Sequence, residues 1–257
     1  MHPAPAHTTP MPPITLVGDG RVGGSFARAL RSAGADVELA GRAGIAGRPA
    51  EVVLLCVPDS EIASACESVV AAAPGLRFAG HTSGATTLDA LAAATAAGAE
   101  TFSLHPLQTI PDSGTDLTGA PVAVAASTPA AADLARRIAT ACQMNPFDVP
   151  EESRAAYHAA AAIASNFLVA LESSAEELLA AAGIENGREL LAPLVLRSAA
   201  NWAERGPDAL TGPIARGDEE TVARHLEAIA ATDPELEPLY RALADRTRTI
   251  AAAGGRR

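Results

Sequence analysis

Three of the six histidines stand in sequence contexts that favour proton-transfer chemistry. His81 and His105 each follow a short apolar run, in HTSG and HPLQ, and His158 lies in the alanine-rich segment YHAAAAIASN. An imidazole titrates near neutral pH and can therefore act as a general acid or base. A histidine can also cap a helix or bond a loop carbonyl, and for His81 this structural role stays open.

His158, Ser165 and Asn166 form the candidate catalytic group. His158 and Ser165 are seven positions apart and would share one face of a helix, with Asn166 on its flank. Because the residues between them are nearly all alanine or isoleucine, these polar groups must find partners or line a cavity. We expect His158 to be the general acid or base, and Ser165 and Asn166 to orient the reacting atom. The alternative is a hydrogen-bonded cluster buried between helices.

Candidate substrate-binding residues occur in two segments. His105 and Gln108 belong to HPLQ, which follows an expected strand, and Thr211 and Arg216 belong to LTGPIARGD. A guanidinium pairs well with a carboxylate, so Arg216 could hold an acidic substrate. The alternative is an ordinary ion pair with a neighbouring carboxylate. The expected partner is therefore a small molecule that carries a carboxylate.

A glycine-rich segment near the N-terminus, ITLVGDGRVGGSFARAL, has the pattern of a strand, a turn and a helix. Gly18, Gly20 and Gly23 have the spacing G-x-G-x-x-G. In dinucleotide-binding proteins the first glycine turns the chain, the second lets the pyrophosphate approach, and the third lets the helix pack closely. We expect these glycines, with Arg21 and Val22 between them, to bind a dinucleotide. The alternative is a plain tight turn.

The end of the second expected strand distinguishes NAD from NADP. NAD-binding proteins have a carboxylate there, which accepts hydrogen bonds from the ribose hydroxyls. This chain has Gly41 followed by Arg42, whose guanidinium could pair with a 2′-phosphate. We therefore expect NADP as cofactor, although Arg42 could also be a solvated loop residue.

Residues at the ends of two later strands are expected to hold the nicotinamide. In a doubly wound sheet, ligands bind outside the carboxyl ends of the strands. One group there is Val57, Pro58 and Asp59, and the other is His81 and Ser83. Asp59 could also cap the helix that follows it.

The pattern of apolar segments predicts an α/β fold, with a doubly wound, mostly parallel Rossmann sheet followed by an all-helical second domain. Helices are expected over residues 151–182 and 188–205, with no strand after residue 150. We expect a disordered leader at 1–13, a dinucleotide-binding domain at 14–150, and a helical domain for substrate binding and dimerisation at 151–257. The expected strands are residues 14–17, 37–39, 52–57, 77–80, 101–104 and 121–125.

Composition and charge argue against several classes of protein. The net charge of −11 disfavours nucleic-acid binding, because phosphate contacts require clustered lysines and arginines. No apolar run reaches the roughly 18 residues typical of a membrane span. The N-terminal segment lacks an apolar signal core, and the three cysteines have no metal or disulfide spacing. We expect a cytoplasmic protein with no metal site and with neither nucleic acid nor membrane as a partner.

Six segments together resemble a bacterial family of Rossmann-like proteins that carry a helical C-terminal domain of unknown function. They are GDGRVGGSFARAL, LLCVPDSEI, HTSG, SLHPLQTI, YHAAAAIASNFLVAL and LTGPIARGD. The family is similar to 6-phosphogluconate, 3-hydroxyacid and prephenate dehydrogenases, ketopantoate reductase and pyrroline-5-carboxylate reductase. SLHPLQ resembles the prephenate dehydrogenase segment whose histidine lies near the substrate, which points to His105.

The resemblance implies an NADP-dependent oxidoreductase. It would transfer a hydride between nicotinamide and the carbonyl or imine of a small carboxylate-bearing metabolite, with ketopantoate as the first candidate. The resemblance also implies a homodimer formed through the helical domain.

The chain departs from this group in one respect. Hydroxyacid dehydrogenases and ketopantoate reductases carry a lysine four residues before an asparagine on the first interdomain helix. Asn166 aligns with that asparagine, but Ala162 stands in place of the lysine, and the sequence contains no lysine. His158 could supply the proton, or no acid is needed, as when a protonated imine is reduced. The alternative function is a non-catalytic protein that senses or binds a dinucleotide or a metabolite.

Overall fold

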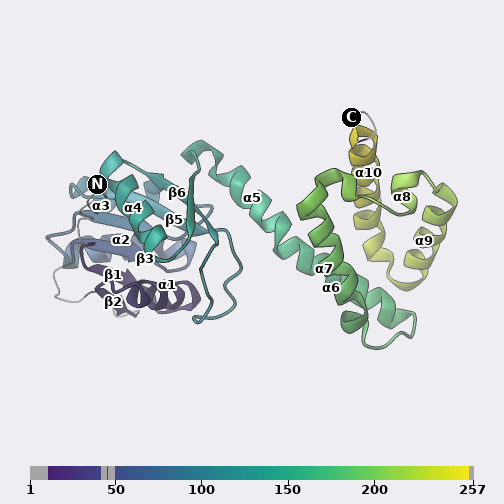
Figure 1. Ribbon diagram of the computed structural model, residues 1–257, viewed down its shortest axis with the longest axis horizontal. Coiled ribbons are helices and arrows are strands. Elements are labelled where there is room, and N and C mark those ends of the chain that lie inside the picture. Colours follow the sequence, from purple (N-terminus) through teal and green to yellow (C-terminus); the bar gives the residue numbers. More distant parts are fainter. Residues whose placement is uncertain (1–10, 42–44, 46–49, 255–257) are drawn as a thin grey trace, which may run out of the picture. The chain divides into compact units, whose positions relative to one another are not determined.

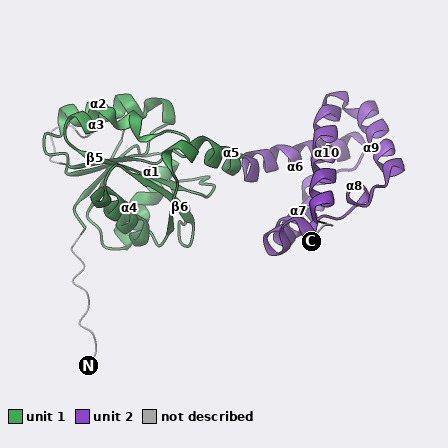
Figure 2. Ribbon diagram, turned by 90° about the horizontal axis from the view of Figure 1, so that it is seen from above, with its two compact units in different colours: residues 1–162 green, residues 163–257 purple. Residues whose placement is uncertain are grey.

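The computed structural model describes residues 11–41, 45 and 50–254. The chain forms two compact units, residues 1–162 and 163–257 (Figure 2). The first unit contains the sheet, and the described part of the second unit contains helices alone. Residues 1–10 of the expected leader lie outside the described residues, whereas Met11 packs against the core of the first unit.

One seven-stranded sheet forms the first unit, in the order β2-β1-β3-β4-β5-β6-β7 (Figure 1). Neighbouring strands are parallel except for β5 and β6. The prediction of a doubly wound, mostly parallel Rossmann sheet followed by helices is confirmed. The strands are β1 (Ile14–Val17), β2 (Val37–Ala40), β3 (Val52–Leu55), β4 (Phe78–His81), β5 (Glu100–Pro106), β6 (Pro121–Ala126) and β7 (Asn145–Asp148).

The far edge of the sheet has two features that the sequence did not specify. No helix joins β5 to β6 among the described residues, so the chain returns without a crossover and β6 runs antiparallel to β5. The sequence prediction also missed β7, which pairs in parallel with β6 at the edge. Its sequence, NPFD, contains asparagine, proline and aspartate, which are depleted in strands.

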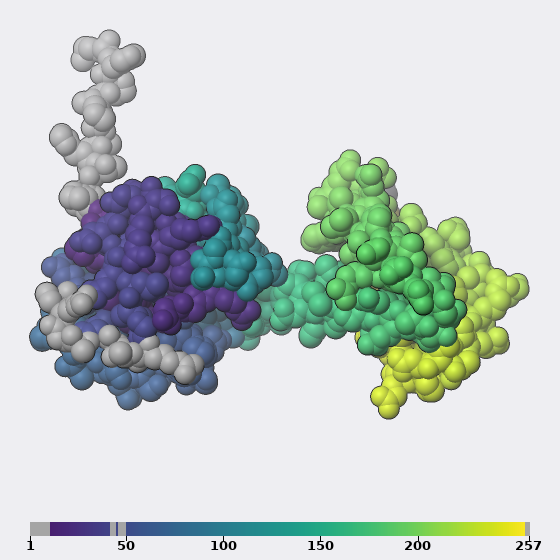
Figure 3. Space-filling view, turned by 90° about the horizontal axis from the view of Figure 1, so that it is seen from below, coloured from purple at the N-terminus to yellow at the C-terminus, as the bar shows by residue number. Residues whose placement is uncertain are grey.

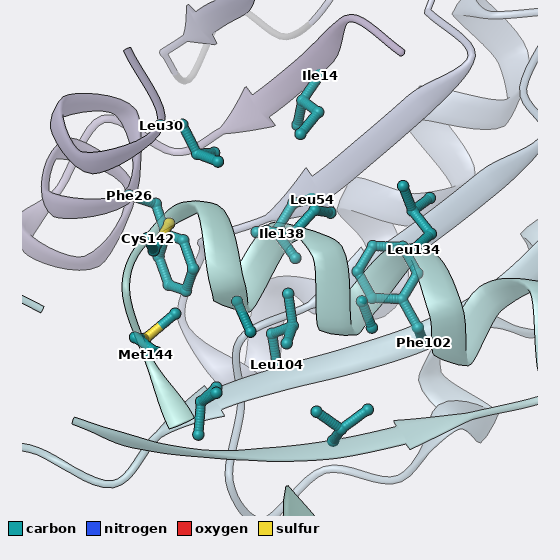
Figure 4. Close-up of a cluster of buried hydrophobic side chains, with 14 of the residues drawn as sticks. Ile14, Phe26, Leu30, Leu54, Phe102, Leu104, Leu134, Ile138, Cys142 and Met144 are labelled. Atoms are coloured by element: carbon teal, nitrogen blue, oxygen red, sulfur yellow. The ribbon is translucent and has the colours of Figure 1, made fainter. Parts of the chain in front are cut away.

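Apolar side chains cover both faces of the sheet. Successive residues of β3 point to opposite faces, so Leu54 joins one buried cluster and Leu55 the other. Phe26 and Ile138 bring two helices onto the first face, as Figure 4 shows. Ile62 belongs to the cluster on the second face. Helices on both faces explain why β3 is a continuous apolar run.

The helices of the first unit follow the predicted alternation with strands. Asp59 was a candidate cap, but it lies in a 3-10 turn after Pro58, and neither this turn nor α2 has a side-chain cap. The helices are α1 (Arg21–Ser32), α2 (Ile62–Ala72), α3 (Ala92–Ala96), α4 (Pro129–Ala141) and α5 (Arg154–Ala164), with 3-10 turns at Asp59–Glu61, Leu88–Leu91 and Glu151–Ser153.

The prediction of one helix over residues 151–182 was wrong. Ser165 has φ −125° and ψ −74°, which interrupts the helix and separates α5 from α6 (Asn166–Ala181). The Ser165 carbonyl accepts a hydrogen bond from the Val169 N–H at 3.2 Å, so serine begins the second helix. Serine is common at this position, but its side chain makes no capping hydrogen bond to α6, so the residue type alone does not explain the break.

The remaining helices belong to the second unit. Asp218 caps α9, because its Oδ1 accepts a hydrogen bond from the Thr221 N–H at 3.0 Å. No helix in the described part of the chain is long and apolar enough to cross a membrane. These helices are α7 (Gly187–Arg205), α8 (Pro213–Arg216), α9 (Glu219–Thr232) and α10 (Glu237–Gly254), with 3-10 turns at Gly206–Ala209 and Pro234–Leu236.

Candidate functional site

Two imidazoles meet over a buried glycine at the carboxyl ends of β4 and β5. A Cβ atom at Gly84 would lie 2.6 Å from Nδ1 of His158 and 2.8 Å from Nε2 of His105. The rings of His105 and His158 pack edge to face, with their centroids 5.7 Å apart. A side chain at this position would displace both rings, so Gly84 forms the floor of the site.

Tyr157 fixes the orientation of His105. Its phenolic oxygen lies 2.7 Å from Nδ1 of His105, which leaves Nε2 of the imidazole toward Gly84. Burial, with smaller contributions from the charges of His158 and Arg154, lowers the pKa of His105 to about 4. His105 is therefore neutral at pH 7 and suited to hydrogen bonding. Burial also raises the pKa of Tyr157 to about 12, so the phenol keeps its proton.

His158 is the other imidazole over Gly84. It is carried by α5, one residue after Tyr157, and it is partly buried. Nδ1 of His158 is inaccessible to solvent and has no hydrogen-bond partner among the described residues. A buried nitrogen of this kind is costly unless a ligand or water completes its hydrogen bonding.

Arg154 ties α5 to the ends of the two strands that carry the histidines. It is 1% exposed and is the largest fully buried side chain of the described residues. Nη2 donates to the Ser83 carbonyl at 2.6 Å, and Nη1 donates to Oγ of Ser103 at 2.8 Å. Nη1 also contacts Oε1 of Glu151 at 3.3 Å, which balances the buried charge. These bonds hold Tyr157 and His158 beside His105.

His81 lies inside the first unit and has no exposed surface. Its Nδ1 accepts a hydrogen bond from the Ser83 N–H at 3.2 Å, so the neutral ring carries its proton on Nε2. Burial, and then the charge of Arg154, lower the pKa of His81 to about 4. The contact with Ser83 shows that His81 shapes the loop after β4.

Asp59 and Ser83 connect the loops after β3 and β4. Oγ of Ser83 donates to Oδ2 of Asp59 at 2.7 Å, and it accepts from the Thr86 N–H at 3.0 Å. Asp59 is exposed, whereas Ser83 is buried. The two loops predicted to hold the nicotinamide are therefore joined to each other directly.

The glycine-rich turn has a geometry that fits a pyrophosphate. Gly18 has φ +106°, and a Cβ there would lie 2.6 Å from the Cys56 carbonyl oxygen. A Cβ at Gly23 would collide with the Gly18 carbonyl oxygen at 1.9 Å, so the helix approaches the turn as predicted. Gly20 begins α1 without a side-chain cap and has open space at its Cβ position. The first N–H groups of α1 are thus accessible to an anion.

A carboxylate lies at the end of β2, although β2 does not supply it. A Cβ at Gly41 would lie 3.0 Å from Oδ2 of Asp19, the residue between the first two glycines of the motif. The residues that follow β2, from which NADP was predicted, do not include this carboxylate. Arg42, on which that prediction depends, lies outside the described residues.

The other candidate residues are distributed over both units. Val57 and Pro58 lie in the loop after β3, and Arg21 and Val22 begin α1. Gln108 is exposed, and its amide donates to the Asp116 carbonyl at 2.9 Å. The remaining candidates, which belong to the second unit, are Ser165, Asn166, Thr211 and Arg216.

Three residues that build the site were not predicted from the sequence. They are Arg154, Tyr157 and Gly84. Arg154 and Tyr157 precede the predicted His158 at the spacing i, i+3, i+4, which places all three on one face of a helix and was a usable signal. The glycine of HTSG gave no such signal, because its role depends on rings that come from β5 and α5. No group of three histidine, cysteine or acidic side chains in the described ranges is arranged to bind a metal ion.

Two protein families match the chain. Residues 120–247 match DUF2520, a domain of unknown function, and residues 36–106 match a Rossmann-like domain. The chain therefore belongs to the Rossmann-like proteins that carry a DUF2520 domain, and the resemblance inferred from the sequence is confirmed. No curated protein matches the sequence.

Solved structures share this fold over nearly the whole chain. A protein from Bacteroides fragilis, provisionally described as an NADP oxidoreductase, is 24% identical with a TM-score of 0.77, covering 92% of this chain and 98% of that one. A Thermotoga maritima protein is 22% identical with a TM-score of 0.77, covering 95% and 100%. An imine reductase from Myxococcus stipitatus, solved with NADP+, is 14% identical with a TM-score of 0.64, covering 95% and 94%.

Proposed function

We propose that the protein is an NADP-dependent oxidoreductase. It transfers a hydride between nicotinamide and the carbonyl or imine carbon of a small carboxylate-bearing metabolite. The observation that carries this proposal is the convergence of His105 and His158 over Gly84, at the carboxyl ends of the strands. Ligands bind at this edge of doubly wound sheets.

The shared fold supports the choice of reaction class. The Bacteroides fragilis protein is described as an NADP oxidoreductase, and the Myxococcus stipitatus protein as an imine reductase in complex with NADP+. In this chain, the uncapped N-terminus of α1, which begins after Gly20, offers backbone N–H groups to the pyrophosphate. When bound, NADPH supplies the hydride.

The histidines divide the remaining chemistry between them. His158 delivers a proton to the oxygen or nitrogen of the reduced bond, because it lies one helical turn before Ala162, which takes the place of the lysine of related enzymes, and the sequence contains no lysine. His105 is neutral and contributes a hydrogen bond from the opposite side of Gly84. Ketopantoate is the first substrate to test, on the resemblance alone. The assigned roles of Ser165, Asn166, Thr211 and Arg216 stay predictions.

The test is NADPH consumption with a panel of 2-oxo acids, including ketopantoate, and cyclic imines. We expect at least one class of compound to be reduced. His158→Gln should lower turnover by roughly 10²–10⁴ without changing nucleotide affinity, because it removes only the titratable group. His225→Gln is the matched control, since His225 belongs to the second unit, where it contacts Tyr240. Nucleotide binding without reduction of any compound would favour the non-catalytic sensor.

We also propose that the chain forms a homodimer through its second unit. Large apolar side chains of α6 and α7 are exposed there, and α7 is green in Figure 3. Exposed apolar patches of this kind commonly mark interfaces between proteins. The exposed residues proposed for the interface are Phe167, Leu168, Val169, Leu190, Leu194 and Trp202, whereas Leu196 is exposed on the opposite face of α7 from Leu194.

A further inference from the structure

Asp19 lies beside the part of a Rossmann site that distinguishes NAD from NADP. It lies between Gly18 and Gly20, immediately after β1, and is exposed. The Gly18 N–H donates to the Ala40 carbonyl at 2.8 Å, so the turn after β1 and the end of β2 are adjacent. The carboxylate of Asp19 extends from this turn toward Gly41.

The carboxylate of Asp19 lies where a side chain at Gly41 would begin. A Cβ built there would lie 3.0 Å from Oδ2 and 3.5 Å from Cγ of Asp19. Because Gly41 has no side chain, there is room for the carboxylate of Asp19 at the end of β2. In Rossmann proteins this is where an acidic side chain accepts hydrogen bonds from the ribose hydroxyls of NAD.

We propose that Asp19 is a specificity-determining residue, whose carboxylate accepts ribose hydroxyls and opposes a 2′-phosphate. The inference rests on the proposed function, because it concerns the adenosine end of the same dinucleotide site. The turn after β1 supplies the carboxylate that β2 lacks, and NADPH is favoured over NADH by less than the sequence of β2 alone predicts.

The experiment compares the dissociation constants of NADPH and NADH for the full-length protein and for Asp19→Asn. The substitution keeps the size of the side chain and removes its charge. We expect NADPH to bind about tenfold more tightly, as removal of one nearby like charge would give. The variant should bind NADH as tightly as the wild-type protein does, or more weakly. The gain for NADPH should shrink at high salt, because exposed charges are screened.

Asp36→Asn is the matched control. Asp36 is also exposed and lies just before β2, at the opposite end of the strand, so the same change in net charge should leave the ratio of the two constants unaltered. An unchanged ratio in Asp19→Asn, with both nucleotides bound, overturns this inference alone. If the wild-type protein binds neither nucleotide, this inference and the proposed function both fail.

Discussion

The phenolic oxygen of Tyr157 lies 2.7 Å from Nδ1 of His105, and this hydrogen bond joins the face of α5 to β5. The two rings meet edge to face, with centroids 5.5 Å apart. Because one nitrogen of His105 is held by the phenol, the other is directed toward Gly84 and the ring of His158. The bond thus orients an imidazole that burial keeps neutral.

Tyr157→Phe tests whether this orientation matters. The substitution leaves Nδ1 of His105 without its partner, so the ring can rotate away from Gly84. We expect turnover to fall roughly 10–100-fold, as small misplacements of catalytic groups commonly cause, with nucleotide affinity unchanged. Steady-state kinetics and nucleotide titration measure the two effects.

The second unit provides a matched control for this substitution. Tyr240 lies 2.7 Å from Nδ1 of His225, so Tyr240→Phe removes the same kind of bond from a different unit. Turnover should be retained in that variant. Full activity of Tyr157→Phe would show that the reaction does not need the fixed His105 ring.

Gly84→Ala tests the convergence of the two imidazoles. The added methyl group would lie 2.6 Å from Nδ1 of His158 and 2.7 Å from Cε1 of His105, well inside contact distance. Both rings are partly exposed and can move, so the protein should fold while losing turnover by about 100-fold or more. Thermal unfolding measures whether the variant still folds, and steady-state kinetics measure its loss of turnover.

Gly75→Ala is the control for introducing a methyl group. A Cβ at Gly75 would meet nothing within 4 Å, so stability and activity should both be preserved. If Gly84→Ala were as active as the wild type, the reaction would not use the space above Gly84.

Local sequence patterns predicted the parts of the fold that local physics determines. The glycine turn is predicted by the spacing of its glycines, and β3 is predicted by its run of apolar residues, so neither needs information from distant parts of the chain. The direction of β6 and the presence of β7 depend instead on pairing between distant segments, and NPFD has little strand propensity. The break at Ser165 has no local signal of this strength, because it interrupts a helical composition and the serine side chain makes no capping hydrogen bond to α6.

The candidate site shows the same limit. The sequence identified His105 and His158 from their type and context, but it could not show that they converge, because Gly84 and Arg154 join them through three different elements. Asp19 was missed for a related reason. Gly41 follows β2 where NAD-binding proteins carry a carboxylate, whereas here the carboxylate comes from the neighbouring turn after β1.

The homodimer can be tested on α7. Leu190 and Leu194 are one helical turn apart and are 59% and 63% exposed, so they form an apolar face. Leu194→Glu should shift the mass measured by light scattering from dimer to monomer, because it places a charge in the interface. Leu196, on the opposite face and 71% exposed, provides the control Leu196→Glu, which should stay dimeric. A monomeric wild-type protein would overturn the proposal.

The last prediction concerns acid stability and His81. An unperturbed histidine has a pKa near 6.5, whereas burial and the charge of Arg154 lower the pKa of folded His81 to about 4. Between these values the unfolded chain binds a proton that the folded protein does not. The free energy of unfolding must therefore decrease as the pH falls from about 6.5 toward 4. The lowered pKa of His105 acts in the same direction.

His81→Asn should make this dependence flatter. The asparagine Oδ1 can still accept the Ser83 N–H, but the side chain no longer titrates. Urea unfolding at several pH values should show a slope smaller than that of the wild type by at most about 1.4 kcal/mol per pH unit below pH 6.5. Above pH 7 the two slopes should coincide, because His81 is then neutral in both states. Equal slopes throughout the acid range would mean that His81 is not held neutral by its burial.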